Sequence, residues 1–323
     1  MSRLTEVTTT GHRLSLTAME EASRAGRRDA DLEHLFLALV LDSHDAGQVL
    51  RRSGVTLDRA RAAIAEQQAA RLAALGITVE TPTAGEITFH RTGGYHWTRR
   101  ATDILTAATA KGRRGDSTAV LRALLAEPSG EIVELLDLLG LSRTELDDEL
   151  DAAEALTRQN EPRSPALSRT GSAFIPAAVP AVWALVSDPA RLPEWDLVLG
   201  DVTPTDTAGT WQGVARDTTP AGKPTRVAPT FHRQLITRPV CEEPARVTWR
   251  FAYPDAPHAN SRRVTLLLEP SANGTLLHLT LEWERAARTG IRRIGGRMLR
   301  PLARFSLWLQ VSQLTASISR AFR

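Results

Sequence analysis

Three histidines in the second half of the chain, His232, His258 and His278, have the side-chain chemistry of a general base. Strand alternation turns His278 outward, and His258 falls in the segment 254–260, which holds two prolines. His232 has no clear strand phase, and Arg233 beside it is either a buried cation for a ligand carboxylate or phenolate or an outward residue. No inward Ser/His/Asp set and no His/carboxylate metal spacing accompanies them. We therefore expect no metal and no cofactor, and His232 and Arg233 are weak catalytic candidates.

The Gly222-Lys223 pair does not form a nucleotide-binding P-loop. Asp217 stands where the first glycine of the motif should be, and Pro224 replaces the Ser or Thr that follows the lysine. We therefore expect this chain to carry out no ATP-driven work of its own.

The length of 323 residues predicts two domains, and 42% hydrophobic with 24% charged residues is typical of soluble globular proteins. No stretch reaches the roughly 18 apolar residues of a membrane span, and the first residues lack a signal-peptide pattern. Cys241 is the single cysteine and makes no internal disulfide, so we expect a cytoplasmic protein.

The two halves of the chain differ in charge. Residues 1–164 carry 20 Lys and Arg against 25 Asp and Glu, whereas residues 165–323 carry 20 against 12. Because nearly all of the positive charge is arginine in an Ala-rich sequence, a coding bias explains it, and no nucleic-acid partner is expected.

The first half contains an internal repeat. The apolar run 35–40 matches 120–125 at an offset of 85, and the run 49–55 matches 135–141 at an offset of 86. Upstream, Thr8 matches Thr98 at an offset of 90. In each copy a threonine suited to cap a helix precedes apolar residues three to four apart, so both copies are predicted to be all-helical.

The segment LTAMEEASRAGRRDADLEHLFLALVLD (16–42), followed by GQVLRRSGV (47–55), resembles the Clp repeat found twice at the N-terminus of Clp-family AAA+ unfoldases. The resemblance implies an all-α double Clp repeat domain at 1–156, with degenerate repeats at about 4–66 and 95–152. In that family the domain binds adaptors, substrate proteins and, in actinobacterial members, antibiotic peptides.

The resemblance also implies a peptide or adaptor surface. Gram-positive members bind phosphoarginine through a Thr and an Arg near the start of each repeat and through the Glu of a Glu-His pair. The first copy here has Thr8 and Glu33 but lacks the Arg, and the second has Thr98 and Arg100 but lacks the Glu, so each pocket is half complete. Trp97 stands where the family often carries an aromatic residue between the repeats, and it either anchors a peptide or packs there.

A linker is expected at 157–170, which has two prolines, polar residues and no apolar period. After it come a short strand at 172–175, a helix at 180–186, five strands at 210–216, 227–237, 246–253, 262–269 and 275–285, and a long amphipathic helix at about 291–322.

The strings AVWALVSDP (181–189) and LPEWD (192–196) resemble the opening of the START-like, polyketide-cyclase-type (SRPBCC) helix-grip superfamily. The resemblance covers about 168–323 and implies an α+β domain at 171–323, in which a curved antiparallel sheet wraps a long C-terminal helix around a cavity. Most members bind lipids, polyketides or other apolar molecules, some catalyse cyclisation or dehydration, and some bind a protein partner instead.

Alternation along the strands and apolar spacing along the last helix predict which side chains face this cavity. In the strand 246–253 the odd-numbered residues share the inner face, and in 275–285 the odd-numbered residues 277–283 do so. The predicted cavity residues are Trp195, Phe231, Trp249, Phe251, Tyr253, Leu279, Leu281, Trp283, Met298, Leu302 and Phe305.

The sequence therefore favours a non-enzymatic binding or regulatory protein. The helix-grip domain would bind a hydrophobic small molecule, and the repeat domain would recognise a peptide, an antibiotic peptide or a Clp-protease component. One alternative is an aromatase/cyclase-type enzyme acting on a polyketide-like substrate, and another is a partner-binding scaffold without a small-molecule ligand. Membrane binding is not expected, because the sheet needs the apolar face of the last helix.

Overall fold

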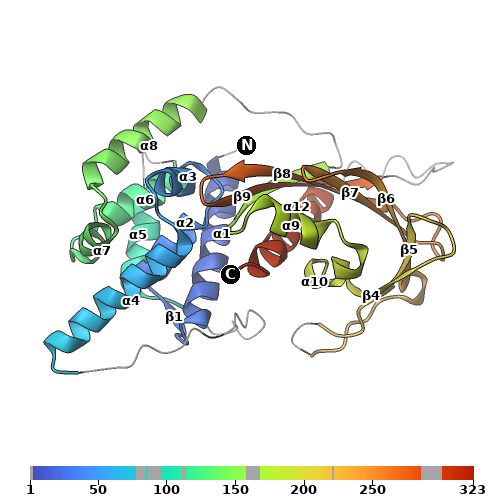
Figure 1. The fold of residues 1–323 in the computed structure, drawn as a ribbon, viewed down its shortest axis with the longest axis horizontal. Coiled ribbons are helices and arrows are strands. Elements are labelled where there is room, and N and C mark those ends of the chain that lie inside the picture. Colours follow the sequence, from blue (N-terminus) through green and yellow to red (C-terminus); the bar gives the residue numbers. More distant parts are fainter. Residues whose placement is uncertain are drawn as a thin grey trace. The chain divides into compact units, whose positions relative to one another are not determined.

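A computed structural model describes residues 3–77, 85, 96–110, 114–157, 168–219, 222–284 and 300–323. The chain forms two compact units, residues 1–160 and 161–323 (Figure 1). Over the described ranges, no helix is long and apolar enough to cross a membrane.

The first unit is helical, with one short parallel pairing between two strands. The order of α2, α3 and α4 recurs as α6, α7 and α8, and α5 stands in the position of α1. This is the element order that the internal repeat predicts. The elements are α1 (Arg3–Arg24), β1 (Asp29–Ala30), α2 (Leu32–Val40), α3 (Asp45–Arg52), α4 (Leu57–Ala74), β2 (His96–Trp97), α5 (Arg99–Thr109), α6 (Ser117–Leu125), α7 (Glu131–Leu139) and α8 (Arg143–Thr157).

Positions that match between the two copies are buried in both. Leu14 and Ala18 of α1 correspond to Ile104 and Ala108 of α5, and none of the four is more than 8% exposed. All of α2 and almost all of α6 are buried, which explains their apolar composition. Gly140 ends α7 with a φ of 68°, a backbone conformation that glycine adopts without steric strain.

Helix caps fix the starts of α2 and α5. The Asp31 side chain accepts a hydrogen bond from the Leu32 backbone, while the His34 ring accepts one from the Asp31 backbone, so α2 begins with a reciprocal cap. The Thr98 hydroxyl accepts a hydrogen bond from the Ala101 backbone at the start of α5. Both caps lie directly after the paired strands β1 and β2, which hold the two helix starts side by side.

The second unit is a seven-stranded antiparallel sheet with helices on one face. The strand order is β3-β9-β8-β7-β6-β5-β4. The elements are β3 (Ser168–Ile175), α9 (Val179–Val186), η2 (Pro189–Arg191), α10 (Leu192–Trp195), β4 (Leu199–Pro204), β5 (Thr210–Ala215), η3 (Pro229–Phe231), β6 (Arg233–Glu242), β7 (Arg246–Ala252), β8 (Ser261–Ser271), β9 (Gly274–Glu284) and α12 (Arg300–Arg320).

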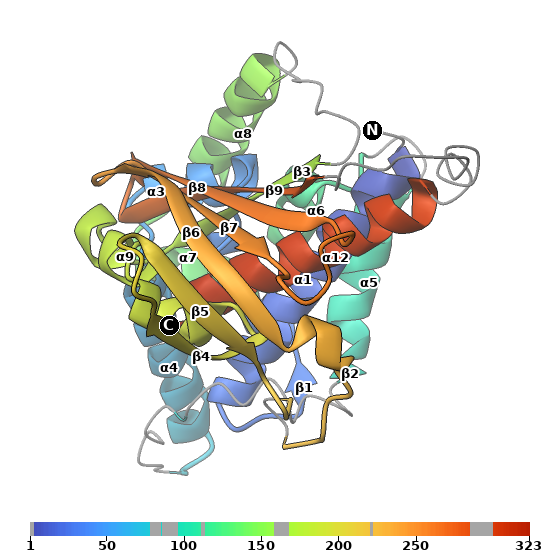
Figure 2. The same ribbon diagram turned by 90° about the vertical axis from the view of Figure 1, so that its right-hand side faces the viewer.

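The inner face of this sheet is covered by helices. α12 packs on β3 and β9, α10 on β4 and α12, and α9 on β8 and β9. The strands curve around α9 and α12 in Figure 1, and Figure 2 looks onto the sheet with α12 crossing beneath it. Alternating side chains of β7, β8 and β9 point inward and form the core with the buried side of α12.

Three segments differ from the sequence-based expectation. β3 begins at Ser168, so the last three residues of the expected linker pair with β9. β4 was not expected, because its residues 199–204 include a glycine, an aspartate and a proline. The expected strand 227–237 begins with η3 instead, since Pro229 starts a helical turn, and β6 starts only at Arg233. Residues 291–299 of the expected last helix lie outside the described part of the chain.

Candidate functional site

A row of inward side chains crosses the sheet of the second unit. Trp283 on β9 pairs with Arg262 on β8, Arg262 with Phe251 on β7, and Phe251 with Ile236 on β6. The next partner is Trp211 on β5. Apart from Arg262, this row is apolar and mostly aromatic. Arg262 is therefore a charged side chain with apolar register partners on both sides.

Arg262 forms a buried ion pair with Asp196, which follows α10. Asp196 is fully buried and Arg262 is 8% exposed. The Arg262 guanidinium donates to both carboxylate oxygens, and its Nη1–Oδ1 distance is 3.4 Å. It also lies 4.2 Å from the centre of the Phe251 ring, so its charge rests on an aromatic face. Within the described part of the second unit, these are the two buried charged side chains, and they neutralise each other.

Several buried polar atoms in this interior have no hydrogen-bond partner among the described residues. They are Trp195 Nε1, Arg262 Nε and both amide atoms of Gln234. Trp195 is fully buried and Gln234 is 1% exposed. A buried polar atom without a partner costs about 1–3 kcal/mol, so native proteins rarely keep several. These atoms are the unpaired polar groups of an otherwise apolar interior.

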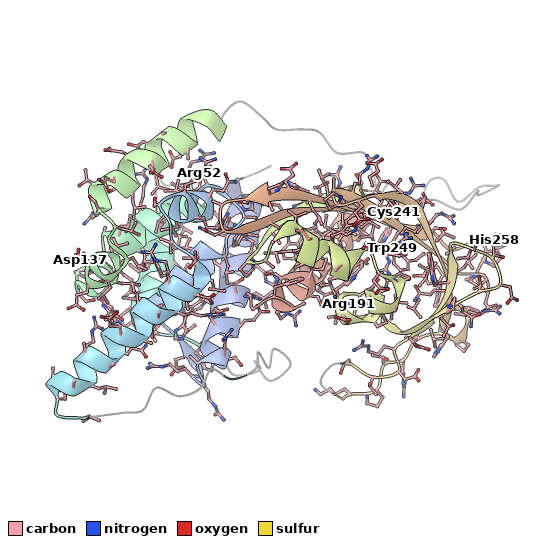
Figure 3. The ribbon with its side chains drawn as sticks, viewed as in Figure 1. Arg52, Asp137, Arg191, Cys241, Trp249 and His258 are labelled. Atoms are coloured by element: carbon pink, nitrogen blue, oxygen red, sulfur yellow. The ribbon has the colours of Figure 1, made fainter. Side chains whose placement is uncertain are left out.

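Five of the predicted cavity residues are fully buried in the core, namely Trp195, Trp249, Phe251, Leu279 and Leu281. Trp249 lies inside the curve of the sheet in Figure 3, and its Nε1 donates to the Val186 carbonyl oxygen of α9 at 2.9 Å. Two further predicted residues, Tyr253 and Trp283, are half-buried. Alternation therefore gives the correct inner face for β7 and β9.

The expected face of the last helix is wrong. Phe305 is 61% exposed, whereas the buried side of α12 is made by other apolar residues. Both stripes are apolar and helically spaced, so hydropathy does not distinguish them. Met298 and the Leu302 side chain lie outside the described part of the chain. The buried residues of α12 that join the core are Leu307, Val311, Leu314 and Ile318.

Phe231 and the two weak catalytic candidates also lie away from the core. Phe231 is 39% exposed, and its ring packs edge-on against the ring of Tyr253, with 5.1 Å between the ring centres. The His232 Nε2 atom is 3.1 Å from the Val227 carbonyl oxygen. Arg233 is exposed and donates to Asp255 at 2.6 and 3.1 Å. The inward residues at the start of β6 are Gln234 and Ile236, and Arg238 further along the strand stacks on Trp211 and Trp249.

The other two histidines do not reach the interior either. His258 is exposed in the loop after β7, at the far end of the second unit in Figure 3. His278 lies on the outer face of β9, 3.5 Å from the Glu269 carboxylate. Sequence reasoning overlooked Gln234, Asp196 and Arg262, three of the polar residues that are buried in the described part of this unit. Arg262 stands two residues before Val264, so strand alternation places both on the same inward face. This alternation could have identified Arg262 as a buried residue.

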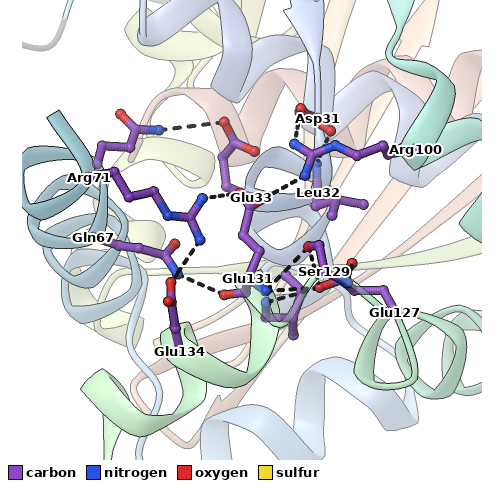
Figure 4. A network of polar contacts seen from close by, with 12 residues as sticks. Asp31, Leu32, Glu33, Gln67, Arg71, Arg100, Glu127, Ser129, Glu131 and Glu134 are labelled. Atoms are coloured by element: carbon purple, nitrogen blue, oxygen red, sulfur yellow. Dashed lines mark hydrogen bonds and ion pairs between the residues drawn. The ribbon is translucent and has the colours of Figure 1, made fainter. Parts of the chain in front are cut away.

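In the first unit, the β1–β2 pairing joins polar residues from both repeats (Figure 4). The Thr98 hydroxyl donates to Asp31 Oδ1 at 2.6 Å. Arg100 donates to Asp31 Oδ2 and to Glu131 Oε2, each at 2.7 Å. Glu33 comes from α2 of the first copy and lies beside these residues, where Gln68 donates to it. The two expected half-pockets therefore contribute to a single cluster, in which carboxylates already bind Arg100.

Glu33 is more buried than Glu131, the other acid from a helix in this cluster. It is 6% exposed, its Oε2 has no hydrogen-bond partner in the described ranges, and Gln68 donates to its Oε1 at 3.5 Å. Burial raises the pKa of Glu33, and the charges of Asp31 and Glu131 act in the same direction. Burial alone would also raise the pKa of Asp31, but hydrogen bonds from Thr98 and Arg100 outweigh it and lower that pKa.

The other expected surface residues are spread over the unit. Thr8 is exposed on α1. Trp97 is half-buried, and its Nε1 donates to Ser15 Oγ of α1 at 3.3 Å. Trp97 therefore packs against the first copy while part of its ring stays accessible.

The second unit matches a known family. Residues 167–307 match the family described as "Polyketide cyclase / dehydrase and lipid transport". Together with the seven-stranded antiparallel sheet and the C-terminal helix, this match decides the fold. The second unit is a helix-grip domain. No curated protein matches the chain.

Several solved structures are similar to the helix-grip domain. The protein XoxI of Bacillus cereus is 14% identical, covers 48% of this chain and 95% of its own, and has a TM-score of 0.34. A conserved protein of Geobacillus kaustophilus is 17% identical, with 48% and 95% coverage and a TM-score of 0.35. A Thermus thermophilus protein is 19% identical, with 47% and 94% coverage and a TM-score of 0.32.

Removing the charge of Glu33 should stabilise the protein near neutral pH. A carboxyl whose pKa is raised by folding stabilises the fold below its unfolded value of 4.5, and this contribution is lost as pH rises through the folded value. Glu33→Gln should therefore raise the free energy of urea unfolding near pH 7 and have no such effect near pH 4, as followed by far-UV circular dichroism.

Glu134→Gln is the matched control with the opposite sign. Hydrogen bonds from Arg71 and Gln67 lower the pKa of Glu134, so its charge stabilises the fold above 4.5 and ceases to do so in acid. This variant should be less stable than the parent near pH 7. Equal effects of the two substitutions would contradict the assigned environments.

Breaking the ion pair of the helix-grip domain should be costly. Arg262→Met leaves the buried Asp196 carboxylate unpaired, and we expect a loss of about 3–5 kcal/mol in the free energy of unfolding, measured by tryptophan fluorescence in urea. Combining it with Asp196→Asn should cost less than the two single losses added together.

Arg246→Met is the control. It removes an exposed pair with Glu242 and should cost less than about 1 kcal/mol in the free energy of unfolding. A similar loss for Arg246→Met and Arg262→Met would refute the buried pair.

Proposed function

We propose that the helix-grip domain binds a hydrophobic small molecule that carries polar groups. The observation that carries this proposal is the set of buried polar atoms of Trp195, Gln234 and Arg262 that have no partner among the described residues. They stand in an interior lined by Trp211, Trp249 and other aromatic side chains, and ligand sites combine such walls with a few placed polar groups. The matched family, described by cyclases, dehydrases and lipid transport, supports the same chemistry of ligand.

Binding is favoured over catalysis by the placement of ionisable groups. His232 and Arg233 contact Val227 and Asp255 outside the core, so neither supplies an interior base. The buried Asp196 and Arg262 are paired with each other. An aromatase/cyclase would have to separate this pair to use either group, and this argues for the binding role.

Native mass spectrometry of the full chain purified from its host tests the proposal. We expect a retained neutral, apolar compound that is released by increased collision energy and extracted by organic solvent. After extraction, the environment-sensitive dye 1-N-phenylnaphthylamine should bind with enhanced fluorescence, and the extracted compound should displace it. A chain that carries no compound and leaves the dye fluorescence unchanged would support the partner-binding scaffold instead.

For the first unit we propose a Clp-repeat-type recognition module for a peptide, an antibiotic peptide or a Clp-protease component. Its support is the recurrence of four helices in the same order, together with the LEHLFLAL string of α2. The half-buried Trp97 supports a peptide surface, since aromatic residues that are partly accessible are common anchors of such surfaces. Phosphoarginine is less well supported, because Asp31 and Glu131 already hold Arg100.

Calorimetry of the full chain with an apolar cyclic peptide antibiotic, of the class that binds actinobacterial unfoldase N-domains, tests this role. We expect micromolar binding that Trp97→Ala weakens by roughly tenfold or more, the loss typical of a central aromatic contact. Ser15→Ala removes only the hydrogen bond to Trp97 Nε1 and should leave binding nearly unchanged. No heat of binding, or equal losses in the two variants, would count against a site at Trp97.

A further inference from the structure

Gln234 is a carboxamide placed among apolar groups. It is 1% exposed on the inner face of β6, and neither Oε1 nor Nε2 finds a partner within the described chain. Leucine or methionine would fill a similar volume without two unpaired polar atoms, each of which costs about 1–3 kcal/mol when buried. A polar group that approaches from outside the chain would satisfy both atoms.

The strand neighbours of Gln234 make no hydrogen bond to its amide within the described chain. Its register partner on β5 is Gly213. A side chain at that glycine would meet Ile236 and Leu199 at 2.8 and 3.0 Å, so apolar groups already fill this side. On β7 the neighbour is Tyr253, one residue beyond the register pair formed by Leu235 and Ala252. The ring of Tyr253 packs against Phe231.

The charges of the interior favour an uncharged ligand. In the described residues of the helix-grip domain, the buried charges are Asp196 and Arg262, which pair with each other. The half-buried Arg238 lies four residues further along β6 than Gln234, where its guanidinium stacks on Trp211 and Trp249 and donates to the Ser187 carbonyl oxygen. A carboxylate held at Gln234 would therefore add a buried negative charge away from Arg238, which is unfavourable. A neutral carbonyl or hydroxyl can still accept from Arg262 Nε or Trp195 Nε1, two further interior donors that have no partner among the described residues.

We propose that Gln234 selects a neutral fused-ring ligand with a hydrogen-bond donor next to an acceptor, such as a lactam or a hydroxyl beside a carbonyl. Gln234 Nε2 donates to the ligand carbonyl oxygen, and Gln234 Oε1 accepts from the ligand N–H or O–H. Arg262 lies two strands away from Gln234, level with Ile236, which is two residues further along β6. Their Cα atoms are therefore roughly 12 Å apart. A ligand of two or three fused rings is long enough to reach both polar points. This inference rests on the proposed function, because it places the ligand in the same interior.

Matched probes test this assignment on the full chain. 2-Quinolone has the required lactam edge, 1-methyl-2-quinolone lacks only the donor, and 2-naphthoate has a similar size with a negative charge. Binding is measured by displacement of 1-N-phenylnaphthylamine. We expect 2-quinolone to bind roughly tenfold more tightly than the methylated compound, which is the effect of one buried hydrogen bond. 2-Naphthoate should bind more weakly than either.

Gln234→Met keeps the size of the side chain and removes both polar atoms. It should abolish the preference for 2-quinolone and leave binding of 1-methyl-2-quinolone within about twofold of the parent. The variant should also unfold at the same or a higher temperature, because an unsatisfied buried amide is lost. Gln212→Met is the control, since Gln212 is exposed on the outer face of the neighbouring strand β5.

The outcomes separate the two proposals. If the naphthylamine does not bind the parent chain, the proposed ligand-binding function fails. If it binds, the inference about Gln234 fails when neither quinolone displaces it, when both quinolones bind equally, when the preference survives Gln234→Met, or when 2-naphthoate binds best. A lower unfolding temperature of Gln234→Met in the ligand-free chain would also overturn it, because the amide would then have a partner within the protein.

Discussion

Alternation along antiparallel strands is the constraint on which the helix-grip domain depends. Each strand turns every second side chain inward, so the same residues that bind the sheet to α9 and α12 also line its interior. A polar residue at an inward position therefore replaces a core residue. Arg262 and Gln234 occupy such positions, and each is buried among apolar neighbours.

The Asp196–Arg262 pair makes the arginine tolerable in this core. Asp196 belongs to the segment after α10, and Arg262 belongs to the middle of the sheet, so the pair joins two elements far apart in the sequence. Buried ion pairs often contribute little to net stability, because desolvation offsets the attraction between the charges. The pair therefore fixes the position of α10 against β8 more than it adds to net stability.

Much of the fold is predictable from the sequence because hydrophobic periods are strong. Alternation identifies the inner faces of β7 and β9, and self-similarity identifies the recurring helices of the first unit. The polar site is harder to predict. Gln234 shares the inward face of Ile236, but η3 interrupts the strand pattern just before it, and Asp196 meets its partner 66 residues later in the chain. On α12, two apolar stripes compete, and hydropathy does not show which one the sheet covers.

The short β1–β2 pairing gives the duplication of the first unit a particular meaning. It brings Asp31 and Glu33 of one copy to Thr98 and Arg100 of the other, so acids and a base from separate copies form one network. The unit is comparable to a homodimer whose subunits were fused into one chain. In a symmetric dimer both subunits must keep every residue of a shared site, whereas fused copies can divide the residues between them. Here Asp31 of one copy and Arg100 of the other supply the two sides of one ion pair, so neither copy holds that pair by itself.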